Sequence, residues 1–340
     1  MGLDREDALR LFRKFDTGEK NLITDVPGVR VGQVTLQEGD IQTGVTAILP
    51  HSDNLFREKL FAGAWVINGF GKSVGLMQIQ ELGTLESPIL MTNTLSVGTA
   101  LTACVKYMLS QNPEIGVEAG TVNCVVTECN DGEMNDIRGL HVREEHVLEA
   151  IGKAEDTFKE GPVGAGTGME MMGLKGGIGS ASRKLELEGT AYTIGAIVLT
   201  NYGTDDNLVI GGDAVGRRIQ AARTKEDKGS CIIVIATDIP LIDRQLRRVA
   251  SRAAHALART GSYTGNGSGD VALAFSTAAR VEHFNQSKFK EIRMLYDEEL
   301  SPVFEATVEV VEEALISSLF HGKTLRGIRG KVLKAVKEYL

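Results

Sequence analysis

Hydrophobic and polar positions change most abruptly between residues 223 and 236. The charged run 223–228 is followed by the small pair Gly229-Ser230 and then by the uninterrupted apolar run 231–236. A short run of mainly β-branched residues predicts a buried strand, and the charged run before it predicts a surface loop. Ser230 is therefore expected at the point where a loop enters a sheet.

The rest of the pattern predicts a mixture of helices and strands. Apolar positions at helical spacing predict helices over residues 1–20, 91–111, 146–160, 243–260 and about the last fifty residues, which end in a basic tail. Short apolar runs predict strands over residues 21–32, interrupted by a turn at Pro27-Gly28, and over 43–50, 63–68, 124–127, 192–199 and 271–276. Strands and helices come in runs rather than in strict alternation, which favours an α+β layered fold.

Composition places the chain among ordinary globular proteins. It has 340 residues, of which 42% are hydrophobic and 24% charged, and this length is enough for one large core. The net charge of -8 leaves no excess of Lys and Arg to neutralise phosphates, so we expect no nucleic-acid partner. No apolar run approaches the ~20 residues of a membrane span, so we expect no membrane partner either.

The cysteines and histidines indicate neither a disulfide framework nor a metal centre. Each of the four cysteines lies in or beside an apolar segment and none forms a CxxC pair, which is typical of a reducing, cytoplasmic compartment. His141 and His146 are five residues apart, so on a helix they point in different directions and form no zinc site. Neither Gly71-Lys72-Ser73 nor the segment 164–168 has the glycine spacing of a nucleotide-binding loop, and no cofactor is expected.

The chemistry expected of Ser230 depends on whether the preceding peptide bond is cut. Cleavage after Gly229 would leave Ser230 with a nucleophilic hydroxyl and an α-amine, whose reference pKa of about 7.7 to 8.0 suits a base near neutrality. Glycine suits the carbonyl side of such a cut because it tolerates a strained backbone and leaves its carbonyl open to attack. The alternative is an ordinary Gly-Ser turn before a core strand, and the dipeptide alone favours the turn.

Three further polar residues lie where loops meet predicted strands. Asn201 follows an apolar strand, and a buried side-chain amide is a good donor to a developing oxyanion. Ser268 and Asp270 lie two residues apart in a glycine-lined loop that enters a strand, so both can face one side. A hydroxyl and a carboxylate there could orient the amine of an N-terminal Ser230. Taken singly, each of them also suits an ordinary turn.

Taken together, the motifs of the chain resemble the L-aminopeptidase/D-esterase (DmpA) family, which includes β-peptidyl aminopeptidases and nylon-oligomer hydrolases. The matching segments run in order across about residues 20–280: 21–32, 68–71, 130–132 with 135–136, 164–168, 175–177, 201–203, 229–230 and 267–270. The resemblance implies an α+β fold of the N-terminal-nucleophile type, namely an αββα four-layer sandwich shared with the ornithine acetyltransferases. It also implies a single peptidase domain, 1–340, that cuts itself into an α chain, 1–229, and a β chain, 230–340.

The resemblance also assigns roles to residues of this chain. It implies that Ser230 is the nucleophile, that Asn201 is an oxyanion donor, and that the pair Ser268 and Asp270 supports the nucleophile. Lys175 matches a lysine near the oxyanion in the nylon-hydrolase branch. Lys175 and Asn130 are therefore candidate substrate-binding residues.

Two positions depart from the pattern of the family, and one role has no single candidate. Asn130 stands where the aminopeptidases usually carry a tyrosine, and Asp270 stands where they commonly carry the longer glutamate. The anchor for a substrate amine could be Glu114, Glu128 or Glu133, which spacing along the chain does not rank.

The resemblance and the residues together predict a self-cleaving serine aminopeptidase or amidohydrolase that acts on the N-terminal residue of small peptides, amides or esters. We expect no cofactor and no metal, and a homo-oligomer that by resemblance is a tetramer of processed pairs. One alternative is an uncut, non-catalytic relative that uses the same pocket to bind a ligand. Another is an acyltransferase of the same fold, although those relatives use Thr where this chain has Ser230.

Overall fold

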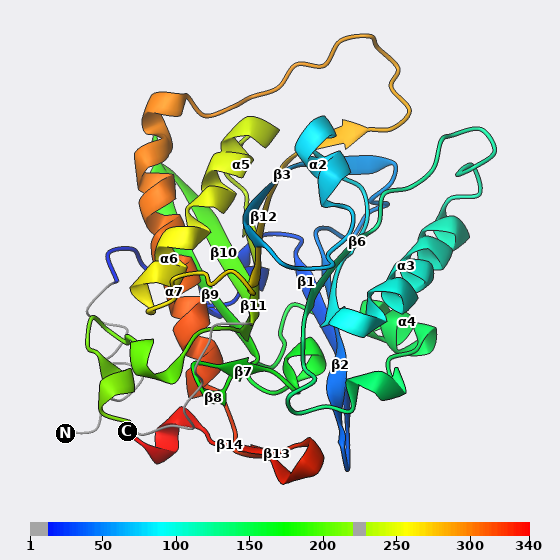
Figure 1. Ribbon diagram of the computed structural model, residues 1–340. Coiled ribbons are helices and arrows are strands. Elements are labelled where there is room, and N and C mark those ends of the chain that lie inside the picture. The colour runs from blue at the N-terminus through cyan, green and yellow to red at the C-terminus, as the bar shows by residue number, and fades with distance from the viewer. Residues whose placement is uncertain (1–12, 220–228) are drawn as a thin grey trace.

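The computed structural model describes residues 13–219 and 229–340. Two β-sheets lie face to face between two layers of helices (Figure 1). The outer face of one sheet is covered by α5 (Asp243–Ser251), α6 (Ala253–Arg259) and α7 (Leu300–Phe320). The outer face of the other is covered by α3 (Val97–Gln111) and α4 (Glu144–Gly152). The predicted α+β sandwich of four layers is confirmed.

The larger sheet carries the strand that begins at Ser230. Over the described residues its order is β4-β3-β12-β11-β10-β9. These strands are β3 (Glu58–Gly69), β4 (Thr84–Leu85), β9 (Ile178–Leu187), β10 (Thr190–Asn201), β11 (Ser230–Thr237) and β12 (Gly269–Glu282). β11 runs antiparallel to β10 and parallel to β12. Ser230 therefore begins a strand in the interior of the sheet.

The smaller sheet has the order β1-β2-β5-β6 in the part of the chain that the structure describes. Its strands are β1 (Arg30–Glu38), β2 (Ile41–Leu49), β5 (Ile89–Asn93) and β6 (Val125–Cys129). Helix α2 (Leu76–Leu82) follows β3. Two short strand pairs complete the described residues, β7 (Glu170–Met171) with β8 (Leu174–Lys175) and β13 (Leu325–Arg326) with β14 (Val332–Leu333).

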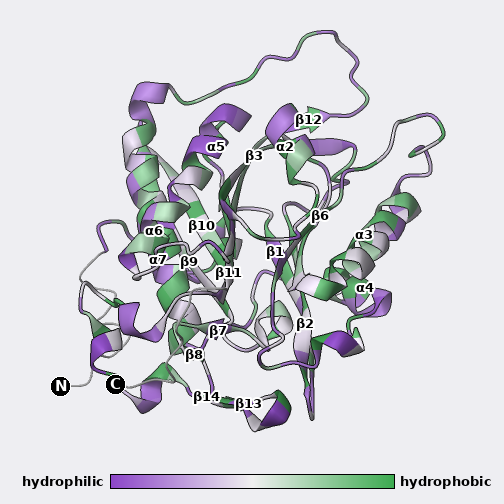
Figure 2. Cartoon of the chain, in the orientation of Figure 1, coloured by the Kyte–Doolittle hydropathy of each residue, from purple (hydrophilic) through white to green (hydrophobic). Residues whose placement is uncertain are grey.

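Buried apolar side chains fill the space between each pair of neighbouring layers. Because side chains alternate along a strand, Ile232 and Val234 of β11 pack between the two sheets, whereas Ile233 and Ile235 pack toward α5, α6 and α7. A third cluster lies between the smaller sheet and helices α3 and α4. Figure 2 shows hydrophobic positions along the central strands. Burial on both faces explains why the run 231–236 is apolar without interruption.

The predicted elements near the two ends of the chain are partly wrong. Residues 1–12 of the predicted helix 1–20 lie outside the described residues, and 13–20 are not helical. The first strand expected within 21–32 is instead a 3-10 turn at Ile23–Asp25. The side chain of Asp25 closes this turn by accepting hydrogen bonds from the backbone amides of Lys20 and Leu22. At the other end, α7 stops at Phe320 and the basic tail forms the β13–β14 pair, since glycine at 322, 327 and 330 is unfavourable in a helix.

Three helix boundaries and one segment without a predicted element also differ. The helix predicted over 91–111 begins at Val97, because residues 89–93 pair in the smaller sheet and Asn93 caps the amides of Leu95 and Ser96. The helix predicted over 146–160 ends at Gly152, and Glu155 then pairs with Val31. The helix predicted over 243–260 is split in two at Arg252. The glycine-dense segment 173–182 contains β8 and the start of β9.

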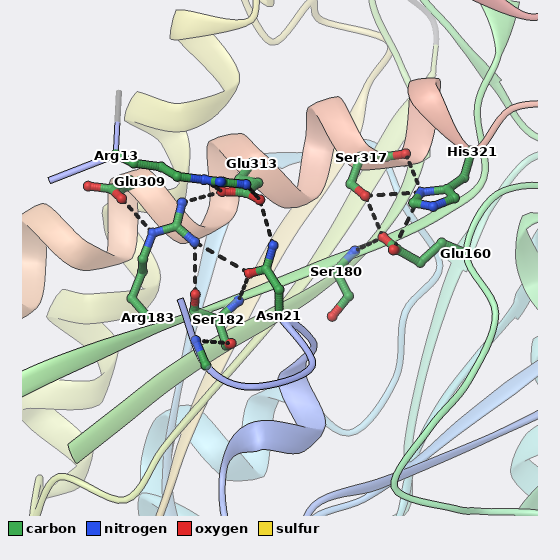
Figure 3. Close-up of polar contacts among 11 residues, drawn as sticks. Arg13, Asn21, Glu160, Ser180, Ser182, Arg183, Glu309, Glu313, Ser317 and His321 are labelled. Carbon is green, nitrogen blue, oxygen red and sulfur yellow. Dashed lines mark hydrogen bonds and ion pairs between the residues drawn. The ribbon is translucent and has the colours of Figure 1, made fainter. Parts of the chain in front are cut away.

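A buried charge network joins the segment before β1 to β9 and α7 (Figure 3). The Arg183 guanidinium donates to Glu309 at 2.5 Å and also to Glu313. The Glu313 carboxylate accepts further hydrogen bonds from Arg13 at 2.8 Å and from Asn21 at 2.6 Å. These bonds outweigh the effect of burial, which by itself raises the pKa of Glu313, and they lower that pKa to about 2. The network attaches the N-terminal segment to the helix layer.

Candidate active site

Ser230 lies at the start of β11, where the two neighbouring strands, β10 and β12, present polar residues. In the ladder between β10 and β11, Ser230 pairs with Asn201. On the other side, a Cβ built on Gly269 would lie only 2.9 Å from Ser230 Oγ. Ser230 is 5% exposed. The sheet register therefore brings the predicted nucleophile next to Asn201 and next to the loop that carries Ser268 and Asp270.

Ser268 and Asp270 face the same side of the chain, as their spacing predicts. The Ser268 hydroxyl donates a hydrogen bond of 2.8 Å to the Asp270 carboxylate, and both side chains are buried. The shorter aspartate therefore still reaches Ser268. Asn68 of β3 holds the loop in place, because its side-chain amide donates to the backbone carbonyls of Gly265 and Ser268. Sequence reasoning did not assign this role to Asn68, although the residue lies within a recognised motif.

The Asn201 side chain is held between two backbone groups. Its amide nitrogen donates to the Asn130 carbonyl at 3.0 Å, and its amide oxygen accepts from the Glu170 backbone N–H at 3.0 Å. The side chain of Asn130 instead accepts from the Gly132 N–H at 2.9 Å, which closes the turn after β6. Asn130 therefore orients Asn201 through its backbone carbonyl, and this contact needs no particular side chain at position 130.

Lys175 is buried behind this site rather than exposed to it. Its ammonium donates to the carbonyls of Met169 at 2.5 Å, Gly176 at 2.8 Å and Gly166 at 3.2 Å. Burial lowers the pKa of Lys175 to about 7, although the negative charges of Glu170 and Asp131 oppose the shift. Lys175 thus holds the turn at Met169, and the backbone N–H of the next residue, Glu170, binds the Asn201 side chain.

Asp131 is a second buried titratable group on this wall of the site. Burial raises the pKa of Asp131 to about 7, against the effect of hydrogen bonds from Thr43 and Asn135. The Asn135 side chain donates to its carboxylate at 3.0 Å. Asp131 directly follows Asn130, whose backbone carbonyl accepts the hydrogen bond from the Asn201 side chain.

Of the three candidate anchors for a substrate amine, Glu128 is the one whose contacts lead to Ser230, through Gly71 and Gly269. Glu128 is the last residue but one of β6 and is 2% exposed. One carboxylate oxygen accepts from the Lys72 backbone N–H at 2.8 Å, and the other accepts from the Thr94 hydroxyl. A Cβ on Gly71 would lie 3.3 Å from the Glu128 carboxylate, and Gly71 packs directly against Gly269.

The other two acidic candidates lie elsewhere. Glu114 is paired with Arg57 at 2.8 Å. Glu133 is 74% exposed and is paired with Lys331 at 2.9 Å. The sequence signal for Glu128 is its position at the end of an apolar strand, and that signal was too general to rank it.

The last residue of β6 contacts the first residue of β11 across the two sheets. The Cys129 thiol lies 3.4 Å from the Ser230 carbonyl and 3.6 Å from the Leu199 carbonyl. Burial raises the pKa of the Cys129 thiol well above its usual range, so it stays neutral and acts as a weak donor. Glu128, the residue before Cys129, lies on the same strand of the second sheet.

A second grouping of serine, histidine and acid does not have the geometry of a catalytic triad. Ser317 and Glu160 both approach the same nitrogen of His321, Nδ1, at 3.2 Å and 3.4 Å (Figure 3). Ser317 is fully buried in α7 and donates to Glu160 at 2.6 Å. In a triad the hydroxyl and the acid contact different ring nitrogens and the hydroxyl faces the substrate, so this cluster is structural.

Other kinds of site were searched for in residues 13–219 and 229–340. No group of three or more His, Cys, Asp or Glu side chains in these ranges could hold a metal ion. No helix in them is both long and apolar enough to cross a membrane. A cavity of about 150 Å³ lies at the start of β1 and the end of α3, where Arg30, His51 and Tyr107 are among the lining residues. It contains none of the predicted site residues.

The two facing sheets between helix layers, together with the family and the solved structures that the chain matches, show a serine aminopeptidase with the N-terminal-nucleophile hydrolase fold. Residues 21–333 match peptidase family S58, and the chain belongs to this family. It is 36% identical to the β-peptidyl aminopeptidase BapA of Sphingosinicella microcystinivorans, over 93% of this chain and 85% of that protein.

Solved structures are similar over nearly the whole chain. The PH0078 protein of Pyrococcus horikoshii OT3 superposes with a TM-score of 0.93 and 51% identity, over 97% of this chain and 95% of that one. The L-aminopeptidase D-Ala-esterase/amidase of Ochrobactrum anthropi, described as a prototype of the serine aminopeptidases and a variant of the Ntn hydrolase fold, gives 0.89 and 35%, over 96% and 94%. The resemblance read from the motifs is therefore confirmed at the level of family, fold and enzyme class.

Proposed function

We propose that the chain cuts itself between Gly229 and Ser230 and that the new N-terminal serine is the nucleophile of an aminopeptidase. The observation that carries this proposal is the convergence at one end of the larger sheet. Ser230 lies there beside Asn201 on one side and beside the bonded pair Ser268 and Asp270 on the other. A nucleophile, an amide donor and a hydroxyl–carboxylate pair are the groups that acyl transfer through an N-terminal serine requires.

In the proposed turnover, the α-amine of Ser230 accepts the proton of its own hydroxyl as Oγ attacks the substrate carbonyl. Asn201 stabilises the oxyanion, and the amine passes the proton to the leaving nitrogen. Water then hydrolyses the acyl ester and restores the hydroxyl. Ser268 and Asp270 orient the amine. The reference pKa of the amine, about 7.7 to 8.0, lies near neutrality, so the amine is an effective base.

The proposed substrates are small peptides, amides or esters with a free N-terminal amine, which include β-peptides. Glu128 is the proposed anchor of the amine, because a buried carboxylate beside the Ser230 pocket attracts an ammonium group more strongly than a solvated one. Glu128→Gln should therefore raise KM for aminoacyl amides at least tenfold. The matched control is Glu114→Gln, which removes the carboxylate that pairs with Arg57 and should leave KM unchanged. An unchanged KM in Glu128→Gln would contradict the assignment of the anchor.

Denaturing electrophoresis and intact-mass spectrometry test the self-cleavage. The purified enzyme should separate into fragments 1–229 and 230–340, and Ser230→Ala should remain one chain without peptidase activity. A wild-type chain that stays uncut while it hydrolyses aminoacyl amides would refute the proposed nucleophile. An uncut chain without activity would favour a ligand-binding role.

The proposed working unit is one domain, 1–340, that after cleavage assembles as a homo-oligomer, a tetramer of processed pairs. Light scattering after gel filtration tests the assembly, and a monomeric processed pair would refute it. We propose a cytoplasmic location because Cys104, Cys124 and Cys129 are buried thiols outside any disulfide, which suits a reducing compartment.

A further inference from the structure

The peptide bond before Ser230 has its own hydrogen-bond donor, separate from Asn201. The backbone N–H of Gly269 donates to the carbonyl oxygen of Gly229 at 3.1 Å. That oxygen belongs to the bond that is cut under the proposed function. Asn201 meanwhile directs its side-chain amide to the Asn130 carbonyl.

We infer that the Gly269 N–H is the oxyanion donor for self-cleavage, whereas Asn201 serves the turnover of external substrates. This inference rests on the proposed function. In the cleavage step, Ser230 Oγ bonds to the Gly229 carbonyl carbon and the negative charge moves to the carbonyl oxygen that Gly269 holds. The C–N bond then breaks and the hydroxyl proton passes to the Ser230 nitrogen. Water hydrolyses the resulting ester, which releases the Gly229 carboxylate and restores the hydroxyl.

The local backbone explains why this donor can approach so closely. A Cβ at position 269 would lie 2.9 Å from Ser230 Oγ and 3.0 Å from both Gly71 Cα and the Phe70 carbonyl oxygen. Only glycine therefore places its N–H at the scissile carbonyl while leaving room for the attacking hydroxyl. The β3–β12 ladder also shifts register between Asp270 and Val271, and irregularities of this kind redirect backbone groups beside active sites.

Position 229 is confined from the opposite direction. A Cβ on Gly229 would lie 1.8 Å from the Asn201 backbone carbonyl oxygen. The Gly229 Cα is therefore packed against the backbone at the end of β10, while the N–H of Gly269 holds the Gly229 carbonyl oxygen. A preorganised donor at the position where charge develops is the arrangement that lowers the barrier to acyl transfer.

Replacement of the Gly269 amide by an ester tests the inference directly. Cell-free translation with glycolic acid at position 269 removes the N–H and adds no side chain. Loss of one oxyanion donor typically slows acyl transfer by about 10²–10³-fold, so cleavage at 229–230 should slow by at least about tenfold. The matched control is lactic acid at Ala274, in the interior of β12 between β3 and β11, which removes a sheet amide far from the scissile bond.

The outcomes separate the inference from the function on which it rests. Slowing of tenfold or more in the 269 ester, relative to the 274 ester, supports the inference, and any smaller slowing overturns it. Mass spectrometry distinguishes cleavage at 229–230 from chemical hydrolysis of either introduced ester. If the unaltered chain itself fails to cut, the proposed function fails instead.

The complementary variant is Asn201→Ala. It should lower the kcat of processed enzyme at least tenfold and change the rate of self-cleavage less than threefold. Equal loss of both rates in Asn201→Ala would contradict the division of labour.

A second measurement covers the case in which the 269 ester does not fold. In uncut Ser230→Ala protein, the Gly269 amide should be protected from hydrogen exchange by the Gly229 carbonyl. In processed enzyme, where Gly229 has become a free chain end, its exchange should be at least tenfold faster. Equal protection in the two forms would overturn the inference.

Discussion

Replacing Glu313 by Gln tests the buried network that attaches the N-terminal segment to α7. The carboxylate of Glu313 accepts from Arg13, Asn21 and Arg183, and its side chain is 1% exposed. These partners lower the pKa of Glu313 from 4.5 to about 2 against the effect of burial. This lowering of the pKa corresponds to about 3 kcal/mol, which agrees with the ~3–5 kcal/mol that breaking a buried ion pair costs.

The assay is urea unfolding of the uncut Ser230→Ala chain with and without Glu313→Gln. At pH 7 the free energy of unfolding should fall by about 3 kcal/mol. The folded-state pKa lies below the unfolded-state value, so this stabilisation is fully present above about pH 4.5 and is lost as the pH falls through about 2. The difference between the two proteins should therefore shrink by about 1.4 kcal/mol per pH unit in that window.

A surface ion pair between the same N-terminal segment and α7 provides the control. Lys14 and Glu305 are 2.7 Å apart, but their side chains are 64% and 51% exposed, and exposed pairs contribute about 0–1 kcal/mol. Glu305→Gln should therefore cost less than about 1 kcal/mol. The reasoning is refuted if Glu313→Gln costs no more than Glu305→Gln at pH 7, or if its effect does not change between pH 4.5 and 2.

Three further outcomes are expected. Gly229→Ala should slow self-cleavage at least tenfold in timed electrophoresis, because its methyl group would lie 1.8 Å from the Asn201 carbonyl oxygen. The control Gly98→Ala, with no atom within 4 Å of the new Cβ, should cleave at the normal rate. Equal rates of cleavage in the two variants would contradict the steric argument. Lys175→Met should lower kcat much more than it changes KM, since the turn that orients Asn201 loses three hydrogen bonds from the ammonium; an unchanged kcat would exclude this role. Dialysis against EDTA should leave activity unchanged, because the described residues contain no cluster that could hold a metal; a loss that added metal restores would contradict this.

Local pattern was sufficient for the strand at Ser230 and failed at several element ends. The run 231–236 is buried on both faces, so every one of its side chains has the same preference and the signal is strong. The C-terminal tail and the segment 153–160 were predicted as helix because apolar spacing does not report what the backbone can pair with. Glu155 finds a backbone partner in Val31, more than a hundred residues away, and the tail pairs with itself.

For the candidate site, sequence motifs named the residues, and the fold decided which of them meet. The residues Ser230, Asn201, Ser268 and Asp270 were named from motifs, because each carries a polar group where a loop meets a strand. Their convergence depends on the sheet order β12-β11-β10, which pairs Ser230 with Asn201. The sequence left Glu128 as one of three acidic candidates. The fold singles it out, because β6 of the smaller sheet meets β11 where that strand begins. Lys175 was assigned to the substrate, yet its three ammonium bonds all go to backbone carbonyls.

The sequence by itself determined the types of polar group, the glycine before Ser230 and the strand that begins there, because these are properties of neighbouring residues. Tertiary structure alone decided which acid packs near the Gly269 loop, which backbone N–H holds the Gly229 carbonyl and which lysine is buried. The physical reason is that hydrogen bonds and charges act over a few ångströms in space, and the residues that meet at this site lie up to about 200 positions apart along the chain.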